Sequence, residues 1–193
     1  MLYHGSPRLL DALTPRNEHG DPELGDVVFA SPSRIFAVVY AGATWGDRDL
    51  EQAVYYDQAD SIEEMALREM RPGAFTDTFH RRRGYLYHLD ATPFEPPPGR
   101  TSPWEVVSPV VVAPLHVEVV EDVGAALEAD LRVTLHLYDP DAPENEVAVR
   151  RQVARMQQMT PEGRAEYLRW RLEPAPPRIR QLFGELGGTA LST

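Results

Sequence analysis

The stretch Val27–Tyr40, VVFASPSRIFAVVY, encodes a strand and a helix in direct succession. Its first four residues, Val27–Ala30, are apolar, which predicts a short buried strand. Ser31 and Pro32 then provide a helix N-cap and a proline for the first helical turn. We therefore expect a helix from Arg34 to about residue 43, directly after the strand.

A second short strand is predicted at the N-terminus. Tyr3 and His4 lie at its end, because the run Gly5–Pro7 stops a strand. The segment 14–26 is rich in Pro, Gly, Asn and Asp, so we expect it to be a long polar loop.

The region after the first helix predicts one more strand and one more helix. The pattern of Gln52–Asp57 favours a strand. Ser61 and Glu64 have the spacing of a capping box, so we expect a helix from there to about Met70. Residues 71–83 are interpreted as a loop that ends in three arginines.

The remaining chain changes from strands to helices. Alternating or β-branched patterns, separated by a run with five prolines, predict strands at Tyr85–Leu89, Trp104–Val112 and Leu115–Val120. Helical patterns follow at about 121–130, 143–158, 161–172 and 177–186. We therefore expect an α+β protein, with a strand-rich body over residues 1–120 and a helical C-terminal extension over 121–193 packed on it.

The composition excludes several chemistries. Of the 193 residues 42% are apolar, enough to bury a core, and there is neither cysteine nor lysine. The absence of cysteine excludes disulfides, thiolate metal sites and a cysteine nucleophile. The absence of lysine excludes Schiff-base chemistry and a phosphate-binding P-loop. The histidines show no metal-ligand spacing, so no metal site is expected.

The charge is divided unevenly along the chain. The formal net charge is -11; residues 1–149 hold 11 arginines and 26 acids, and residues 150–193 hold 8 arginines and 4 acids. An acidic body argues against a protein that coats nucleic acid or an anionic membrane. We interpret the basic C-terminal part as helices docked on the body, the alternative being a surface for a protein or other anionic partner.

No targeting segment is predicted. The N-terminus has neither a basic region nor a long apolar stretch, and the longest apolar run, within Ile35–Ala43, is half of what a bilayer span needs. We expect a soluble, cytoplasmic protein, with secretion without a signal as the alternative.

Three motifs occur in an informative order. They are YHGS at Tyr3–Ser6, VFAS at Val28–Ser31 followed by a helix that ends in Tyr40, and WEVVS at Trp104–Ser108. Their order and spacing resemble the ADP-ribosyltransferase-like superfamily, and most of all its His-Tyr-Glu branch, which includes diphtheria-type toxins and the poly(ADP-ribose) polymerases. The resemblance covers residues 1–120 and implies a split antiparallel β-sheet as an NAD-binding core.

The resemblance implies an NAD-dependent ADP-ribosyltransferase or NAD glycohydrolase. Such enzymes bind NAD as a substrate, release nicotinamide and transfer ADP-ribose through an oxocarbenium-like transition state. A fixed carboxylate stabilises the positive charge that develops on the ribose. By resemblance the catalytic carboxylate is that of Glu105.

The resemblance also assigns the NAD-binding residues. His4 matches the histidine that binds the adenine-side ribose, and Gly5 would pair through its backbone with the nicotinamide amide. The nicotinamide ring would lie between the aromatic side chains of Phe29 and Tyr40, which are eleven residues apart; relatives have tyrosine at the first of these positions. The neighbouring serines of the two motifs complete the expected set, Ser6 and Ser31.

The acceptor of ADP-ribose is left open. Enzymes that modify arginine carry Glu or Gln two residues before the catalytic glutamate, where this chain has Pro103, which argues against arginine as the acceptor. A protein, a nucleic acid, a small molecule or water all fit. The run Arg81–Arg83 is interpreted either as a site for the NAD pyrophosphate or a nucleic-acid acceptor, or as a solvated loop.

Other functions stay open beside this one. A catalytically silent relative would bind NAD, another nucleotide or a protein through the same residues. An NAD-consuming RNA 2′-phosphotransferase is a further alternative, against which the acidic body argues. A toxin, or a protein whose C-terminal helices contact a partner, is the last.

Overall fold

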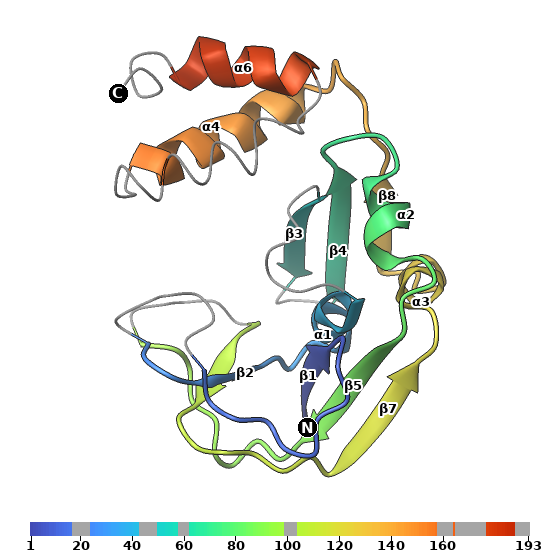
Figure 1. The fold of residues 1–193 in the computed structure, drawn as a ribbon, viewed down its shortest axis with the longest axis vertical. Coiled ribbons are helices and arrows are strands. Elements are labelled where there is room, and N and C mark those ends of the chain that lie inside the picture. The colour runs from blue at the N-terminus through green and yellow to red at the C-terminus, as the bar shows by residue number, and fades with distance from the viewer. Residues whose placement is uncertain are drawn as a thin grey trace. The chain divides into compact units, whose positions relative to one another are not determined.

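The computed structural model describes residues 1–16, 24–42, 50–57, 62–98, 104–157, 164 and 177–187. This part of the chain is α+β, with small antiparallel sheets and few helices, as the sequence predicted (Figure 1). The strands are β1 (Leu2–Ser6), β2 (Val28–Ala30), β3 (Leu50–Asp57), β4 (Ile62–Glu69), β5 (Gly84–Leu89), β6 (Val106–Ser108), β7 (His116–Val120) and β8 (Val133–His136). The helices are α1 (Arg34–Gly42), α2 (Ala74–Phe79), α3 (Val123–Glu128), α4 (Pro143–Gln157) and α6 (Pro177–Gly187).

The strands form three small sheets. Their orders are β1-β5-β7, β2-β6 and β3-β4-β8, and the pairs β1–β5, β5–β7 and β2–β6 are antiparallel. A single antiparallel bridge between Tyr3 and Ser31 links β1 to β2. The first two sheets are therefore connected edge to edge at one point, where the motifs of the sequence meet.

The chain divides into two compact units that interleave along the sequence. Unit 1 comprises Met1–Asp47, Val54–Met65 and Phe75–Thr134, and unit 2 comprises Arg48–Ala53, Ala66–Ala74 and Leu135–Thr193. No helix in the ranges given above is long and apolar enough to cross a membrane.

Unit 1 is built around α1, which packs against β1 and β5 (Figure 1). Glycines at the contact let the helix backbone approach the sheet backbone. A Cβ on Gly84 would lie 2.4 Å from the Ala41 carbonyl oxygen. The opposite sheet face carries an apolar cluster of buried residues: Leu2, Leu13, Val28, Ala30, Tyr87, Leu89 and Val112.

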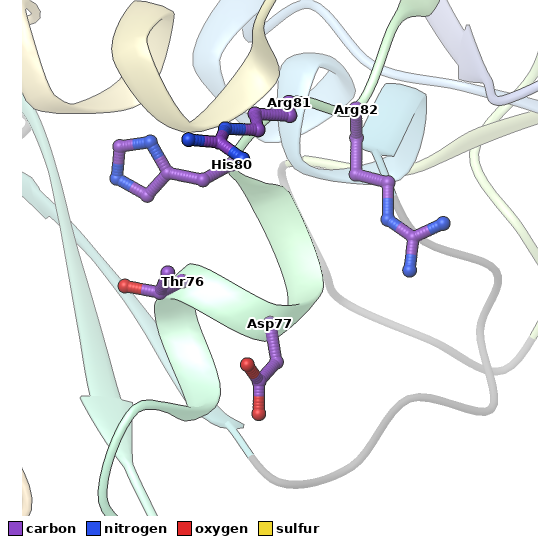
Figure 2. A pocket seen from close by; sticks show the side chains of 5 residues that line it. All are labelled: Thr76, Asp77, His80, Arg81 and Arg82. Carbon is purple, nitrogen blue, oxygen red and sulfur yellow. The ribbon is translucent and has the colours of Figure 1, made fainter.

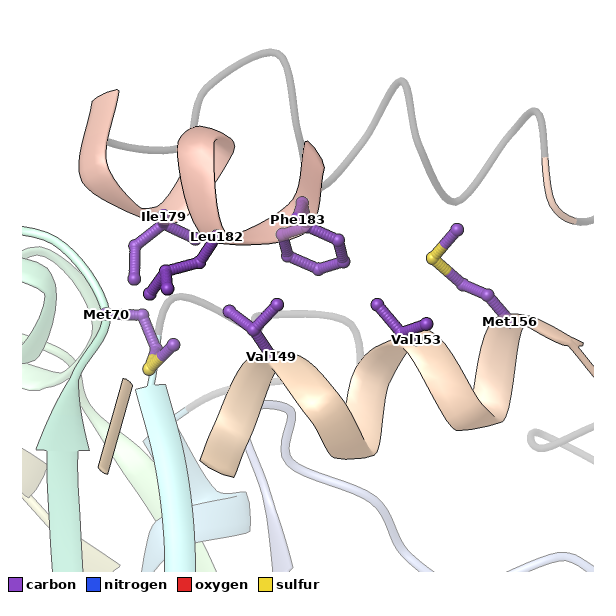
Figure 3. Close-up of a cluster of buried hydrophobic side chains, with 7 residues drawn as sticks. All are labelled: Met70, Val149, Val153, Met156, Ile179, Leu182 and Phe183. Atoms are coloured by element: carbon purple, nitrogen blue, oxygen red, sulfur yellow. The ribbon is translucent and has the colours of Figure 1, made fainter. Parts of the chain in front are cut away.

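Unit 2 has its own core between α4 and α6. Figure 3 shows side chains of the two helices directed toward one another, with Met70 beside them. The buried members are Met70, Val149, Val153, Met156, Ile179, Leu182 and Phe183. Phe183 is fully buried, and burying a side chain of this size contributes about 3 kcal/mol to stability.

The helix expected from Ser61 to Met70 is wrong, because the segment forms strand β4. Met65, Leu67 and Glu69 are buried, whereas Ala66 and Arg68 are half-buried, which is the two-residue period of a strand. The Ser61–Glu64 spacing is compatible with a helix start, but the alternating burial decided the outcome.

The loop expected over residues 71–83 is also wrong in part. Gly73, with φ 74°, makes a turn, and α2 follows at once. Ala74, Phe75, Thr78 and Phe79 form its buried face. This helix has only six residues, too few for its periodicity to stand out from the sequence.

The C-terminal region contains a strand that the helical interpretation missed. The helix expected at 121–130 is the shorter α3, and β8 follows it at Val133–His136. The expected strands at 104–112 and 115–120 are shortened to β6 and β7. Helices α4 and α6 confirm the last predictions, while the helix expected at 161–172 lies outside the described residues except for Arg164.

Candidate functional site

The junction of β1 and β2 brings the first two motifs together. The backbone N–H of Tyr3 donates to the Ser31 carbonyl, and the Ser31 N–H donates to the Tyr3 carbonyl, each at 2.8 Å. One residue further, His4 Nδ1 lies 2.7 Å from the Phe29 carbonyl oxygen. A carbonyl oxygen can only accept, so His4 Nδ1 carries a proton and donates it to this bond.

The position of Gly5 follows from this bond pattern. Tyr3 uses both of its backbone groups on Ser31, so within the antiparallel β1–β5 pair the bonded positions are those of Leu2, His4 and Ser6. The N–H and C=O of Gly5 therefore point away from β5, toward β2. In a regular ladder they would bond to Phe29, but the Phe29 carbonyl accepts from His4 instead.

Gly5 consequently presents an open backbone edge. Among the described residues, no backbone hydrogen bond joins Gly5 to β2. One donor and one acceptor thus lie side by side beyond the single bridge. This pair is complementary to a primary carboxamide, which offers one acceptor oxygen and an NH₂ donor.

Gly5 also determines where α1 lies. A Cβ at this position would lie 1.8 Å from the Ala37 carbonyl oxygen and 2.6 Å from the Ala41 nitrogen, both in the backbone of α1. No side chain fits there, so glycine is needed for the helix to rest on β1. Because Tyr40 directly precedes Ala41, the same contact fixes the distance between the Tyr40 backbone and β1.

Helix α1 begins at Arg34, as the sequence predicted, but its N-cap residue differs from the predicted one. The N-cap is Ser33, whose Oγ accepts from the Phe36 N–H at 3.0 Å. Ser31, the predicted cap, accepts with its Oγ from the Ser33 N–H at 3.0 Å and is buried. Pro32 lies between the two serines, before the helix, so the capping residue is displaced by two positions.

Tyr40 and Glu105 come together although they are far apart in sequence. Burial, and after it the negative charge of Glu105, raise the pKa of the Tyr40 phenol above its ordinary value of 10.0. Glu105 directly precedes β6, where Val106 pairs with Ala30. Continuing this register by one pair sets Glu105 opposite Ser31.

The expected residues are distributed over two faces of the strands. Val28 and Ala30 belong to the apolar cluster, so strand alternation places Phe29 on the opposite face of β2. His4 lies on the cluster face, where its ring meets that of Tyr87 edge-on at a centroid distance of 5.9 Å. His4 is therefore joined to Phe29 by a hydrogen bond to the Phe29 backbone carbonyl, while the two side chains lie on opposite faces.

Ser6 has a local role. It is buried at the end of β1, and its Oγ accepts from the Arg8 N–H at 3.2 Å. Its hydroxyl therefore shapes the turn after the strand.

A polar cluster on the helix face was missed by the sequence interpretation. Arg34 of α1 forms an ion pair with Glu118 of β7, and His88 Nε2 lies 3.3 Å from the other oxygen of Glu118. The His88 ring contacts those of Tyr3 and His116, each at a centroid distance of 5.2 Å. Only the register of three strands, Tyr3 beside His88 beside His116, brings these residues together.

A separate open pocket of about 670 Å³ lies at the C-terminal end of α2 (Figure 2). Its lining residues are Thr76, Asp77, His80, Arg81 and Arg82. Arg81 and Arg82 belong to the run that the sequence left open as a site for the NAD pyrophosphate or a nucleic-acid acceptor, or as a solvated loop. Arg83, the third arginine of the run, is instead bonded to Glu121 through two hydrogen bonds of 2.9 and 2.7 Å.

The open edge of Gly5 can therefore bond a carboxamide, and the charge of Glu105 acts on the Tyr40 phenol. The Tyr40 ring packs on that of Phe36, at a centroid distance of 5.2 Å. In the part of the chain that the structure describes, no group of three or more His, Asp or Glu side chains could hold a metal ion. Comparison of the chain with protein-family models, with curated proteins and with solved structures found no match.

Proposed function

We propose that the chain is an NAD-dependent ADP-ribosyltransferase of the His-Tyr-Glu type, with residues 1–120 as its NAD-binding core of split antiparallel sheets. The observation that carries this proposal is the open backbone edge of Gly5. Its N–H would donate to the nicotinamide amide oxygen, and its C=O would accept from the amide NH₂. This amide group is what distinguishes nicotinamide from an aromatic ring without substituents.

Phe29 and Tyr40 would enclose the nicotinamide ring. Phe29 points away from the apolar cluster and Tyr40 lies on α1, and aromatic faces stack favourably on a flat heterocycle. The Tyr40 phenol is protonated at neutral pH, as any tyrosine of ordinary or raised pKa is, so its hydroxyl can donate a hydrogen bond. Phe29 provides a stacking face without a hydroxyl.

Glu105 would act on the developing positive charge. In the reaction the bond between ribose C1′ and the nicotinamide nitrogen breaks, and the electron pair leaves with neutral nicotinamide. A lone pair of the acceptor then forms the new bond at C1′, and the acceptor proton passes to solvent. A carboxylate fixed beside C1′ stabilises the cationic transition state more than the ground state.

His4 would bind the adenine-side ribose. Its bond to the Phe29 carbonyl holds the ring in place through Nδ1, and the ring would contact a ribose hydroxyl through Nε2. The same bond ends the β1–β2 ladder, so His4 contributes twice: it would contact the ribose and it opens the Gly5 edge.

Nicotinamide release from NAD by the purified full-length chain tests the proposal. Glu105→Gln preserves shape and removes the charge, and we expect turnover to fall about 100-fold or more. Glu95→Gln is the matched control, because Glu95 is exposed and only its backbone pairs, with Val107. Equal, background-level release by the native chain and Glu105→Gln would refute the enzymatic function.

A silent NAD-binding module is the second candidate. Phe29 favours it, because this position lacks the hydroxyl that relatives carry there. Calorimetry distinguishes the two functions. Binding of NAD by the native chain, with no nicotinamide release, would support the silent module.

A further inference from the structure

Strand β7 lies at the edge of its sheet. In the order β1-β5-β7 it pairs with β5 on one side, and among the described residues no strand pairs with its other side (Figure 1). An exposed strand edge presents N–H and C=O groups to which a further strand can bond. The outer edge of β7 is therefore a surface on which another chain can pair through its backbone.

The bonds between β5 and β7 show which backbone groups are used inside the sheet. The His88 carbonyl points toward β7, because it accepts from the Leu115 N–H at 2.8 Å. His88 is paired with His116, so the backbone groups of His116 are directed toward β5. Alternation along an antiparallel strand gives Glu118 the same direction.

Val117 and Val119 consequently have outward-facing backbone groups. In the ranges that the structure covers, neither residue forms a backbone hydrogen bond outside the sheet. The edge is also apolar at both ends, because the Val119 side chain is 46% exposed and that of Leu115, just before the strand, is 63% exposed. Pairing with a further strand would remove both side chains from water.

The sequence of this edge is complementary to itself when two copies run antiparallel. Leu115–Val119 reads LHVEV, with Val117 at its centre, an imidazole before it, a carboxylate after it and an apolar residue at each end. A two-fold axis at Val117 sets His116 opposite Glu118 of the second copy. It also sets Leu115 opposite Val119 of the second copy.

Charge selects this register over its neighbour. In an antiparallel pair, side chains directly opposite each other interact, and like charges there are destabilising. An axis at Glu118 would place two carboxylates opposite each other. An axis at Val117 instead gives each carboxylate an imidazole, which carries at least one N–H donor in either protonation state.

Glu118 is already held in position for this contact. Arg34 forms an ion pair with its Oε1, and His88 Nε2 lies 3.3 Å from its Oε2. A carboxylate has about four acceptor positions, so it can accept from a further donor. Because His116 is exposed, its side chain is accessible to a second copy.

We propose that two copies of the chain pair through β7, antiparallel and centred on Val117, so that their three-stranded sheets join into one continuous sheet. The interface is isologous, because the same residues contribute from both copies. A contact through one short strand is small, so the dimer is weak and forms at high protein concentration. The proposal does not depend on NAD binding.

Oxidation of single-cysteine variants tests the register, because the chain has no cysteine of its own. In Val117→Cys the two thiols would face each other across the axis, with Cα atoms about 5.5 Å apart, which a disulfide can span. In Val119→Cys the Cα atoms would lie about 13 Å apart along the strands, too far for a disulfide. With oxidised glutathione we expect at least tenfold more covalent dimer from Val117→Cys, although Val119 is the more exposed residue.

Sedimentation equilibrium of the full chain measures the association itself. In about 0.15 M salt, which screens the net charge of -11 on both copies, the average mass should rise with concentration from one chain toward two. Val119→Pro lacks the outward N–H and should weaken association at least tenfold, whereas an edge strand tolerates proline at such a position. Val119→Thr is the matched control, because it keeps the N–H and the branched shape, and should associate within about threefold of the native chain.

The pairing of His116 with Glu118 is tested by charge. His116→Glu sets carboxylates opposite each other and should weaken association at least tenfold, whereas His116→Arg keeps a donor and should preserve it. Thermal unfolding of the dilute variants shows that each monomer is folded.

Three results would overturn the proposal. They are a single-chain mass at every concentration, equal disulfide formation by Val117→Cys and Val119→Cys, and association that His116→Glu leaves unchanged. A chain that stays monomeric and binds an extended peptide at β7 would likewise refute the second copy as the occupant. Glu105→Gln should associate like the native chain, so failure of the proposed enzyme activity would leave these results unaffected.

Discussion

His4 Nδ1 and the Phe29 carbonyl oxygen lie 2.7 Å apart, and this side-chain bond occupies the acceptor that the Gly5 N–H would use in a regular ladder. Strands β1 and β2 are therefore joined by a single bridge, and the side chain of His4 takes the place of the next backbone hydrogen bond between them. The opening at Gly5 is a consequence of local hydrogen bonding, so it can be tested residue by residue.

Removing the imidazole should weaken the fold at this junction. His4→Ala leaves the Phe29 carbonyl without this donor, and we expect the free energy of unfolding to fall by about 1–2 kcal/mol. Urea denaturation followed by circular dichroism measures it. His136→Ala is the control, because in the ranges it covers the structure gives the His136 side chain no hydrogen bond, and a similar loss in both variants would contradict the assignment.

Gly5→Ala should be among the most damaging single changes in unit 1. The added Cβ meets the Ala37 carbonyl oxygen at 1.8 Å, so α1 has to move, at a cost of about 3 kcal/mol. Thermal unfolding measures the loss. Gly184→Ala is the opposite control: this glycine lies in α6 with nothing within 4 Å of a Cβ, so alanine should stabilise by about 0.5–1 kcal/mol. A tolerated Gly5→Ala would show that α1 does not rest on β1 as described.

The buried phenol of Tyr40 is expected to lower the free energy of unfolding at alkaline pH. Its pKa is raised in the folded protein, first by burial and then by Glu105, so above about pH 10 the unfolded chain ionises more readily than the native one. The stabilisation is complete below pH 10 and declines as the pH rises further. Unfolding measured against pH should show a smaller decline in Tyr40→Phe, because the ionisable group is gone. Parallel curves for both proteins would exclude the burial of Tyr40 as the cause.

Arg81→Gly should raise the free energy of unfolding by about 1 kcal/mol, because glycine adopts a positive φ without steric strain. Arg81→Ala removes the same guanidinium but keeps a Cβ, so it should not gain stability. Denaturant titration of the two variants measures the difference. Equal stabilities would show that the backbone at this turn is not strained.

Local patterns in the sequence predicted much of unit 1. The apolar run before Ser31 and the helix after it appear as β2 and α1, and the strand at His4 appears as β1. These elements have strong local signals: β-branched runs, serines before a helix, and glycine after a strand. The nearness of Tyr40 and Glu105 was expected only through the resemblance of the motif order to a known family.

Features that depend on register could not be predicted in this way. The segment expected to form a helix from Ser61 forms strand β4, because pairing with neighbouring strands stabilises the alternating burial of Met65 and Leu67. The face on which His4 lies depends on its pairing with Tyr87, which is 83 positions away in the chain. Such long-range pairings leave no trace in a local window of sequence.

Gly5 and Gly84 have one further consequence for how this chain tolerates change. Both let α1 touch the sheet backbone to backbone, so the spacing between the helix and the strands is set by main-chain atoms. A side chain at position 5 or 84 would collide with the backbone of α1, so both positions are closed to any residue larger than glycine unless the helix moves. Because Tyr40 lies on that helix, such a substitution would also displace the Tyr40 ring.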